Sequence, residues 1–176
     1  MLSARTRDQI TAVVTEEMFK KYKTPTQFAA LPLAKLEKEI KRISYYKTKA
    51  IHLKELARII HTDFKDVVPR DLATLLTLPG VGRKTANLVL GEAFGKAGIT
   101  VDTHVHRITN RWGYLKTKSP LETEMQLRAK LPKKWWIAIN PIVVAFGQTI
   151  CQPVSPKCST CPVRMYCPRI GVVKHR

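Results

Sequence analysis

Four cysteines, the only ones in the chain, lie in one 17-residue segment near the C-terminus. Six, two and five residues separate them in turn, and they are Cys151, Cys158, Cys161 and Cys167. Thiolates are the usual ligands of a [4Fe-4S] cluster, so this spacing predicts one iron–sulfur site. Zinc is the alternative, although structural zinc usually takes its thiolates from two close Cys-x-x-Cys pairs and only one such pair is present. Disulfides are disfavoured, because no secretory context accompanies the cysteines.

Basic residues strongly outnumber acidic ones. The 176-residue chain has 31 lysines and arginines against 13 aspartates and glutamates, which gives a formal net charge of +18. This excess indicates a polyanionic partner, and nucleic acid is the leading candidate. An anionic membrane surface fits less well, since the charges are spread along the chain and not gathered on one amphipathic helix. Neither a signal peptide nor an apolar run of about 18 residues is visible, so we expect an intracellular protein with no membrane span.

Apolar residues recur at helical spacing through most of the chain, and strand-like alternation is lacking, so we predict an all-α fold. Three such stripes run from Ile10 to Met18, from Leu33 to Ile43 and from Ala50 to Ile60. Ser119 and Glu122 flank the Pro120-Leu121 pair and predict a helix start with a capping box. The segment after Cys151 has little periodicity, and we expect metal ligation to hold it together.

A glycine-rich turn of sequence LPGVG, residues 78–82, separates two expected helices, Asp71 to Thr77 and Arg83 to Phe94. Because Gly80 and Gly82 have no Cβ, backbone N–H groups there can approach a phosphate oxygen, and the following helix dipole points the same way. An ordinary helix link with a glycine C-cap would use the same residues. Together with the net charge and the cysteines, the turn favours a contact with a nucleic-acid backbone.

These segments together closely resemble the helix-hairpin-helix DNA glycosylases of the endonuclease III family. The matching stretches are the LSARTRD opening, YYKTKA at 45–50, LPGVGRKTA at 78–86, VDTHVHR at 101–107, the approach from Phe146-Gly147 to Cys151, and the four-cysteine segment. The resemblance implies a helical barrel domain beside a smaller helical domain with a [4Fe-4S] cluster, both gripping double-stranded DNA. We place the barrel at 1–96, its hairpin at about 71–94, the cluster domain at 97–176 and the cysteine loop at 151–167.

The resemblance implies base-excision repair, in which oxidised pyrimidines are removed and the strand is then cleaved at the abasic site. Lys84 would be the nucleophile, whose amine attacks C1′, expels the base and forms a Schiff base that permits β-elimination. A phosphate contact is the plainer role for a lysine after a glycine turn. The helix start and Arg83 disfavour its ammonium form, whereas bound phosphates favour it. Asp102 would cap the next helix and also accept a proton or stabilise positive charge on the sugar.

An oxidised base inside a duplex can be reached only after its nucleotide rotates out of the stack. By resemblance Tyr45 is the wedge that enters the vacated space, although an aromatic pair between helices is more often core. Arg5 stands where many family members have a glutamine that fills the gap left by the extruded base. The remaining expected DNA contacts are Gly80, Val81, Gly82, Arg83, Thr85, His104 and Lys157.

Two other functions fit the same residues. One is a monofunctional mismatch or adenine glycosylase, but such relatives generally lack an amine at the position of Lys84 and use water instead. The other is a non-catalytic DNA-binding iron–sulfur protein. It stays open because family chains normally begin with an earlier helix, whereas Met1 falls within the first barrel helix and suggests a partial chain. A monomer is expected for a protein that tracks along DNA.

Overall fold

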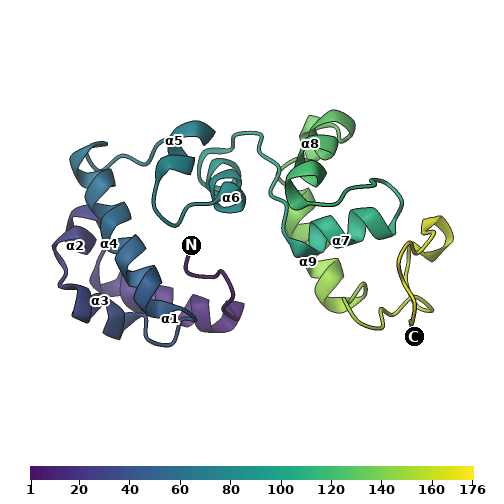
Figure 1. Cartoon of the computed structure of the whole chain (residues 1–176), viewed down its shortest axis with the longest axis horizontal. Coiled ribbons are helices and arrows are strands. Elements are labelled where there is room, and N and C mark those ends of the chain that lie inside the picture. Colours follow the sequence, from purple (N-terminus) through teal and green to yellow (C-terminus); the bar gives the residue numbers. More distant parts are fainter. The chain divides into compact units, whose positions relative to one another are not determined.

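The computed structural model describes all 176 residues (Figure 1). It contains nine α-helices, two short 3-10 helices and no β-strand, so the all-α prediction is confirmed. The α-helices are α1 (Asp8–Lys21), α2 (Pro25–Ala30), α3 (Leu33–Glu39), α4 (Tyr46–Thr62), α5 (Leu72–Thr77), α6 (Arg83–Phe94), α7 (Thr103–Arg111), α8 (Pro120–Lys130) and α9 (Ile139–Thr149). The 3-10 helices are η1 (Lys133–Trp135) and η2 (Arg164–Tyr166). None of the helices combines the length and the hydropathy needed to cross a membrane.

The chain forms two compact units, Met1–Ala86 and Asn87–Arg176, which divide within helix α6. The first unit contains α1 to α5 and the start of α6, and the second contains the rest of α6 and everything after it. Each unit has its own cluster of buried apolar side chains. The domain limit expected between residues 96 and 97 stays a prediction.

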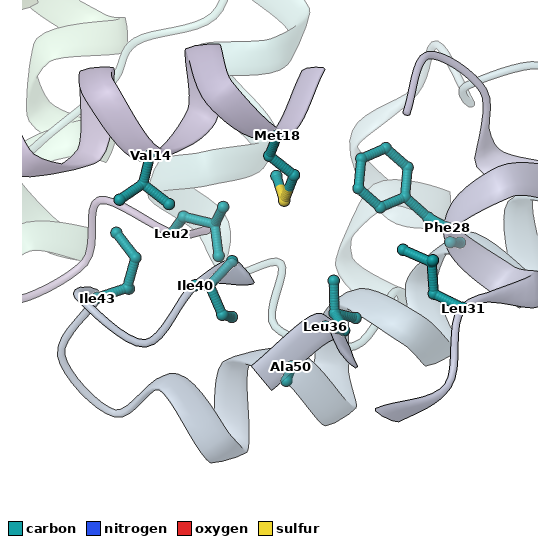
Figure 2. Close-up of a cluster of buried hydrophobic side chains, with 10 residues drawn as sticks. Leu2, Val14, Met18, Phe28, Leu31, Leu36, Ile40, Ile43 and Ala50 are labelled. Atoms are coloured by element: carbon teal, nitrogen blue, oxygen red, sulfur yellow. The ribbon is translucent and has the colours of Figure 1, made fainter. Parts of the chain in front are cut away.

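The core of the first unit lies where α4 packs against α2 and α3 (Figure 2). Its buried side chains are Leu2, Val14, Met18, Phe28, Leu31, Leu36, Ile40, Ile43, Ala50 and Ala57. Leu36, Ile40 and Ile43 of the predicted apolar stripe are buried, whereas Leu33 at its start is 36% exposed, and α3 already ends at Glu39. A turn follows, in which the Ile43 N–H donates to the Ile40 carbonyl at 2.8 Å. Both isoleucines therefore stay in the core without being helical.

Helix α7 is the centre of the second unit, where it packs against α8 and α9. A Cβ on Gly147 of α9 would collide with the ring of His104 and with Ile108, so the close approach of these helices requires glycine. Helix α8 begins as predicted, because the Ser119 hydroxyl accepts a hydrogen bond from the Glu122 N–H at 3.2 Å. The capping box is not closed, since the Glu122 carboxylate accepts from the N–H of Lys118, one residue before the cap.

Candidate functional site

The turn between α5 and α6 has the geometry that its glycines predicted. Gly80 follows Pro79 and has a φ of +73°, and the Val81 N–H donates to the Leu78 carbonyl at 3.1 Å. Pro followed by a glycine with positive φ is the pattern of a type II turn. A Cβ on Gly80 would also lie 2.6 Å from the Met1 sulfur and 3.2 Å from His52, so the positive φ requires glycine here and any side chain would displace its neighbours.

Lys84 lies in the first turn of α6, directly after this hairpin, and its side chain is exposed. Helix α6 begins as predicted, with the Ala86 N–H donating to the Gly82 carbonyl at 2.9 Å. Of the other hairpin residues, Gly82 is exposed, whereas Val81, Arg83 and Thr85 are half-buried. The start of a helix directs backbone N–H groups and a positive dipole end toward whatever binds there, which suits an anion. A basic amine therefore stands beside a turn that can receive a phosphate.

Asp102 caps helix α7, as predicted. Its Oδ1 accepts hydrogen bonds from the backbone N–H groups of His104 and Val105, both at 2.9 Å. The carboxyl group is half-buried and is held in one orientation by these two bonds. Lys84 belongs to the first unit and Asp102 to the second, so each is placed by the contacts of its own unit.

Tyr45 and Arg5 lie against each other. The sequence predicted a DNA-contacting role for each of them but not their contact. The Arg5 guanidinium is 5.6 Å from the centre of the Tyr45 ring, and its Nη1 donates to the Tyr45 hydroxyl at 3.4 Å. Tyr45 is 63% exposed, while Tyr46 packs on the core of the first unit. The two adjacent tyrosines therefore differ: Tyr46 packs on the core, whereas Tyr45 is exposed to solvent beside the Arg5 guanidinium.

Lys49 was not singled out in the sequence, but it organises this region. Its side chain is buried, and its Nζ donates to the carbonyls of Leu2, at 2.8 Å, and Ala4. The Thr6 hydroxyl lies 3.4 Å from the same Nζ. Burial lowers the pKa of Lys49 from its usual value. A lysine within the apolar stripe of α4 was the signal that could have indicated a buried role.

All four cysteines are free thiols that line one cavity of the second unit. Trp112, Phe146 and Ile150 supply apolar walls. Burial raises the pKa of the Cys158 thiol, and charge repulsion from the other three cysteines raises it further. No three His, Cys, Asp or Glu side chains converge closely enough to hold a single metal ion. The four thiols lie on the wall of this one cavity.

Two arginines of α7 hold the cysteine segment, and one of them, Arg111, also lines the cavity. Arg107 Nη2 donates to the Cys151 carbonyl at 3.0 Å. Arg111 donates through Nη1 to the Gln152 carbonyl and through Nη2 to the Pro153 carbonyl, both at 2.7 Å. Its Nη1 also lies 3.5 Å from Cys151 Sγ. Sequence reasoning did not identify these arginines, although both follow Asp102 on the same short helix.

His104 and Lys157 differ in their surroundings. His104 is half-buried, and its Nδ1 lies 3.1 Å from Arg107 Nη2, next to the glycine of α9. Lys157 is exposed at the edge of the cysteine cavity, with its backbone N–H donating to the Ile150 carbonyl at 3.0 Å. DNA contact by either residue, and by the hairpin residues, stays a prediction.

Comparison with known proteins gives one consistent family. The family model of the HhH-GPD superfamily base excision DNA repair proteins matches residues 1–135. Endonuclease III of Thermotoga maritima is 44% identical over 167 residues, which cover 95% of this chain and 78% of the relative. Endonuclease III of Bacillus subtilis is 42% identical over 167 residues, which cover 94% of this chain and 76% of the relative.

The structure also matches a solved protein–DNA complex. A trapped endonuclease III–DNA covalent intermediate, the estranged-adenine complex, matches with a TM-score of 0.90 at 40% identity, covering 96% of this chain and 79% of that one. The sequence, the helical fold and the glycine hairpin therefore agree. The chain belongs to the endonuclease III family, within the HhH-GPD superfamily of base excision DNA repair proteins.

Proposed function

We propose that this endonuclease III family member acts as a bifunctional DNA glycosylase and abasic-site lyase on duplex DNA, with Lys84 as its nucleophile and oxidised pyrimidines as its targets. The family membership supports the reaction class. The observation that carries the assignment of Lys84 is its place: an exposed amine in the first turn of α6, beside a hairpin suited to a phosphate. The related endonuclease III has been trapped as a covalent intermediate with DNA, which also supports covalent catalysis.

The proposed reaction proceeds in three steps. The neutral Lys84 amine attacks C1′ of the damaged nucleoside, so that a C–N bond forms while the glycosidic bond breaks and the base leaves with a proton. The sugar ring then opens at the C1′–O4′ bond, O4′ takes up a proton, and C1′ becomes the carbon of a Schiff base with the lysine nitrogen. Removal of a C2′ proton then allows the 3′ phosphate to leave by β-elimination. Monofunctional relatives that hydrolyse with water need no such amine, so Lys84 disfavours that alternative.

Asp102 would support the chemistry as a carboxylate of fixed orientation. The two N–H bonds to its Oδ1 hold it at the start of α7. From there it would accept a proton or stabilise the positive charge that develops on the sugar. Capping and catalysis use the same orientation, so the two roles are compatible.

Tyr45 and Arg5 would fill the space that the rotated nucleotide leaves. An aromatic side chain can stack between bases, and an adjacent cation can contact the exposed base edge or a phosphate. Both side chains are exposed and already lie against each other. Hairpin contacts through residues 80–83 and Thr85, with His104 and Lys157, would add affinity without sequence preference. The protein would act as a monomer inside the cell, where its genomic substrate lies.

The cysteine cavity fits a [4Fe-4S] cluster better than a zinc ion. Each cysteine of a cubane binds a different iron, so the four thiols must surround a volume, as the cavity-lining cysteines do. Cys151, Cys158, Cys161 and Cys167 would be the ligands. The bound cluster would cross-link a segment whose only helix is the short η2. It would take part in no step of base excision.

Replacing Cys161 with serine is expected to remove the visible thiolate-to-iron absorbance and to lower affinity for duplex DNA about tenfold, because the segment's basic residues lose their fixed positions. The rate at saturating DNA should change much less. Fluorescence anisotropy at several salt concentrations measures the affinity and should show a shallower salt dependence. Thr160→Ala, an exposed change between two of the cysteines, is the control. Wild-type affinity in Cys161→Ser would contradict a structural cluster.

The proposed function is tested by borohydride trapping of the unaltered protein. Duplexes with an abasic site or with thymine glycol are incubated with the protein and reduced, and covalent adducts are separated by denaturing electrophoresis. We expect adducts with both duplexes, because reduction fixes the Schiff base. An adduct with the abasic duplex but not with the thymine glycol duplex would show that the protein is a lyase that does not excise the base. Intact DNA binding without any adduct would favour the monofunctional or the non-catalytic alternative.

A further inference from the structure

We infer that Lys49 is a positioning residue, which holds the segment Leu2–Thr6 so that Arg5 and Tyr45 meet DNA as one preformed pair. The inference rests on the proposed wedge role of Tyr45. Lys49 itself is only 7% exposed, so it does not contact DNA directly. Its effect would pass through the backbone on both sides of the pair.

The contacts of Lys49 join the two members of the pair. Its backbone N–H donates to the Tyr45 carbonyl at 3.0 Å, in the first turn of α4. Its Nζ donates to the carbonyls of Leu2 and Ala4, which precede Arg5 in the chain. The Lys49 side chain therefore holds the loop that carries the arginine, while its backbone lies in the turn of α4 that follows Tyr45.

Thr6, on the other side of Arg5, completes this arrangement. Its hydroxyl lies 3.4 Å from Lys49 Nζ and accepts a hydrogen bond from the Ser44 N–H at 3.1 Å. Residues before and after Arg5 are thus tied to Lys49, and the residue before Tyr45 is tied to Thr6. An ammonium group has three donors, which match the carbonyls of Leu2 and Ala4 and the hydroxyl.

The backbone conformations of Arg5 and Tyr45 explain why the contacts of Lys49 and Thr6, called the clamp below, are needed. Arg5 has a φ of +56° and Tyr45 a φ of +57°, in the left-handed region that residues with a Cβ seldom adopt. Conformations of this kind persist only where surrounding contacts enforce them, and they are frequent at ligand-binding positions. Without the ammonium group, the carbonyls of buried Leu2 and of Ala4 lose their donor, and the loop should relax away from the pair.

The test compares Lys49→Met with Lys47→Met. Both remove one positive charge from α4, but Lys47 is exposed and has no place in the clamp. Two rates are measured: excision of thymine glycol from a duplex under single-turnover conditions, and β-elimination on a single-stranded abasic oligonucleotide, which requires no base extrusion. A 2-aminopurine next to the lesion reports extrusion as a rise in fluorescence.

We expect Lys49→Met to lower duplex excision at least about tenfold and to reduce the fluorescence rise, because displacement of positioned groups has effects of this size. Elimination on the single strand should stay at the wild-type rate, and Lys47→Met should leave excision close to wild type. In a Tyr45→Ala background, Lys49→Met should have almost no further effect on excision, since residues that act through each other are not additive.

Three results would overturn the inference: equal excision by the two lysine variants, full additivity with Tyr45→Ala, or an unchanged fluorescence rise in Lys49→Met. If Lys49→Met does not fold, Thr6→Val replaces it, with the same expected direction and a smaller loss. Failure of the proposed function itself is distinguishable, because the unaltered protein would then either form no adduct on the single-stranded abasic oligonucleotide or show no excision of thymine glycol.

Discussion

Lys84→Ala is expected to lower excision of thymine glycol from duplex DNA by at least about a thousandfold and to abolish the borohydride-trapped adduct, because loss of a nucleophile has effects of this order or larger. The fold should be unaffected, since the side chain is exposed and alanine favours a helix. Single-turnover excision, trapping on an abasic duplex and thermal unfolding measure these three quantities.

The same variant separates the two roles that a lysine after a glycine turn can have. If Lys84 only contacts a phosphate, Lys84→Ala should bind DNA more weakly but react at the normal rate once DNA is saturating. If Lys84 is the nucleophile, the variant should bind DNA normally but react much more slowly at saturation. Lys47→Ala, which removes an equal charge from an exposed position of the first unit, is the matched control for general electrostatic loss. A trapped adduct that persists in Lys84→Ala would show that another amine attacks C1′.

Asp102→Asn should have the second largest effect, with excision lowered by about 10² to 10⁴. Asparagine caps a helix about as well as aspartate does, so the bonds to the His104 and Val105 N–H groups should survive. The unfolding free energy should therefore change little, while the negative charge at the sugar is lost. Excision at saturating DNA and chemical unfolding are the two measurements.

Asp102→Ala is the informative companion of Asp102→Asn, because it removes both the cap and the charge. It should lose about as much activity as Asp102→Asn and, in addition, about 1 kcal/mol of stability. If Asp102→Asn keeps wild-type excision while Asp102→Ala is both less stable and less active, the aspartate is a structural cap and has no catalytic role.

Those parts of the fold that depend on local signals could be predicted from the sequence. The range Arg83–Phe94 was expected as a helix and is observed with the same bounds after its glycine turn, and the helix expected after the capping Asp102 begins at Thr103. The end of α3 was not predictable in the same way. Apolar periodicity reports which side chains are buried, and Ile40 and Ile43 are buried through a turn and not through a continued helix.

The candidate site was predictable as a set of residues but not as a set of contacts. Arg5 and Tyr45 are 40 residues apart, and only the tertiary fold places the guanidinium beside the ring. Lys49 is missed for a related reason. Its main partners are the backbone carbonyls of Leu2 and Ala4, 47 and 45 residues away, and every residue has such a carbonyl, so no side-chain pattern identifies them.

The attachment of the cysteine segment to α7 has a consequence for how this part of the chain can change during evolution. Arg107 and Arg111 hold it through the carbonyls of Cys151, Gln152 and Pro153, and the Arg111 carbonyl accepts in return from the Ile170 N–H at 3.0 Å. Backbone groups are the same whatever side chains they carry. The exposed residues between the first two cysteines, such as Val154 and Lys157, can therefore vary, and the charge of this surface can change by mutation without detaching it from the helix.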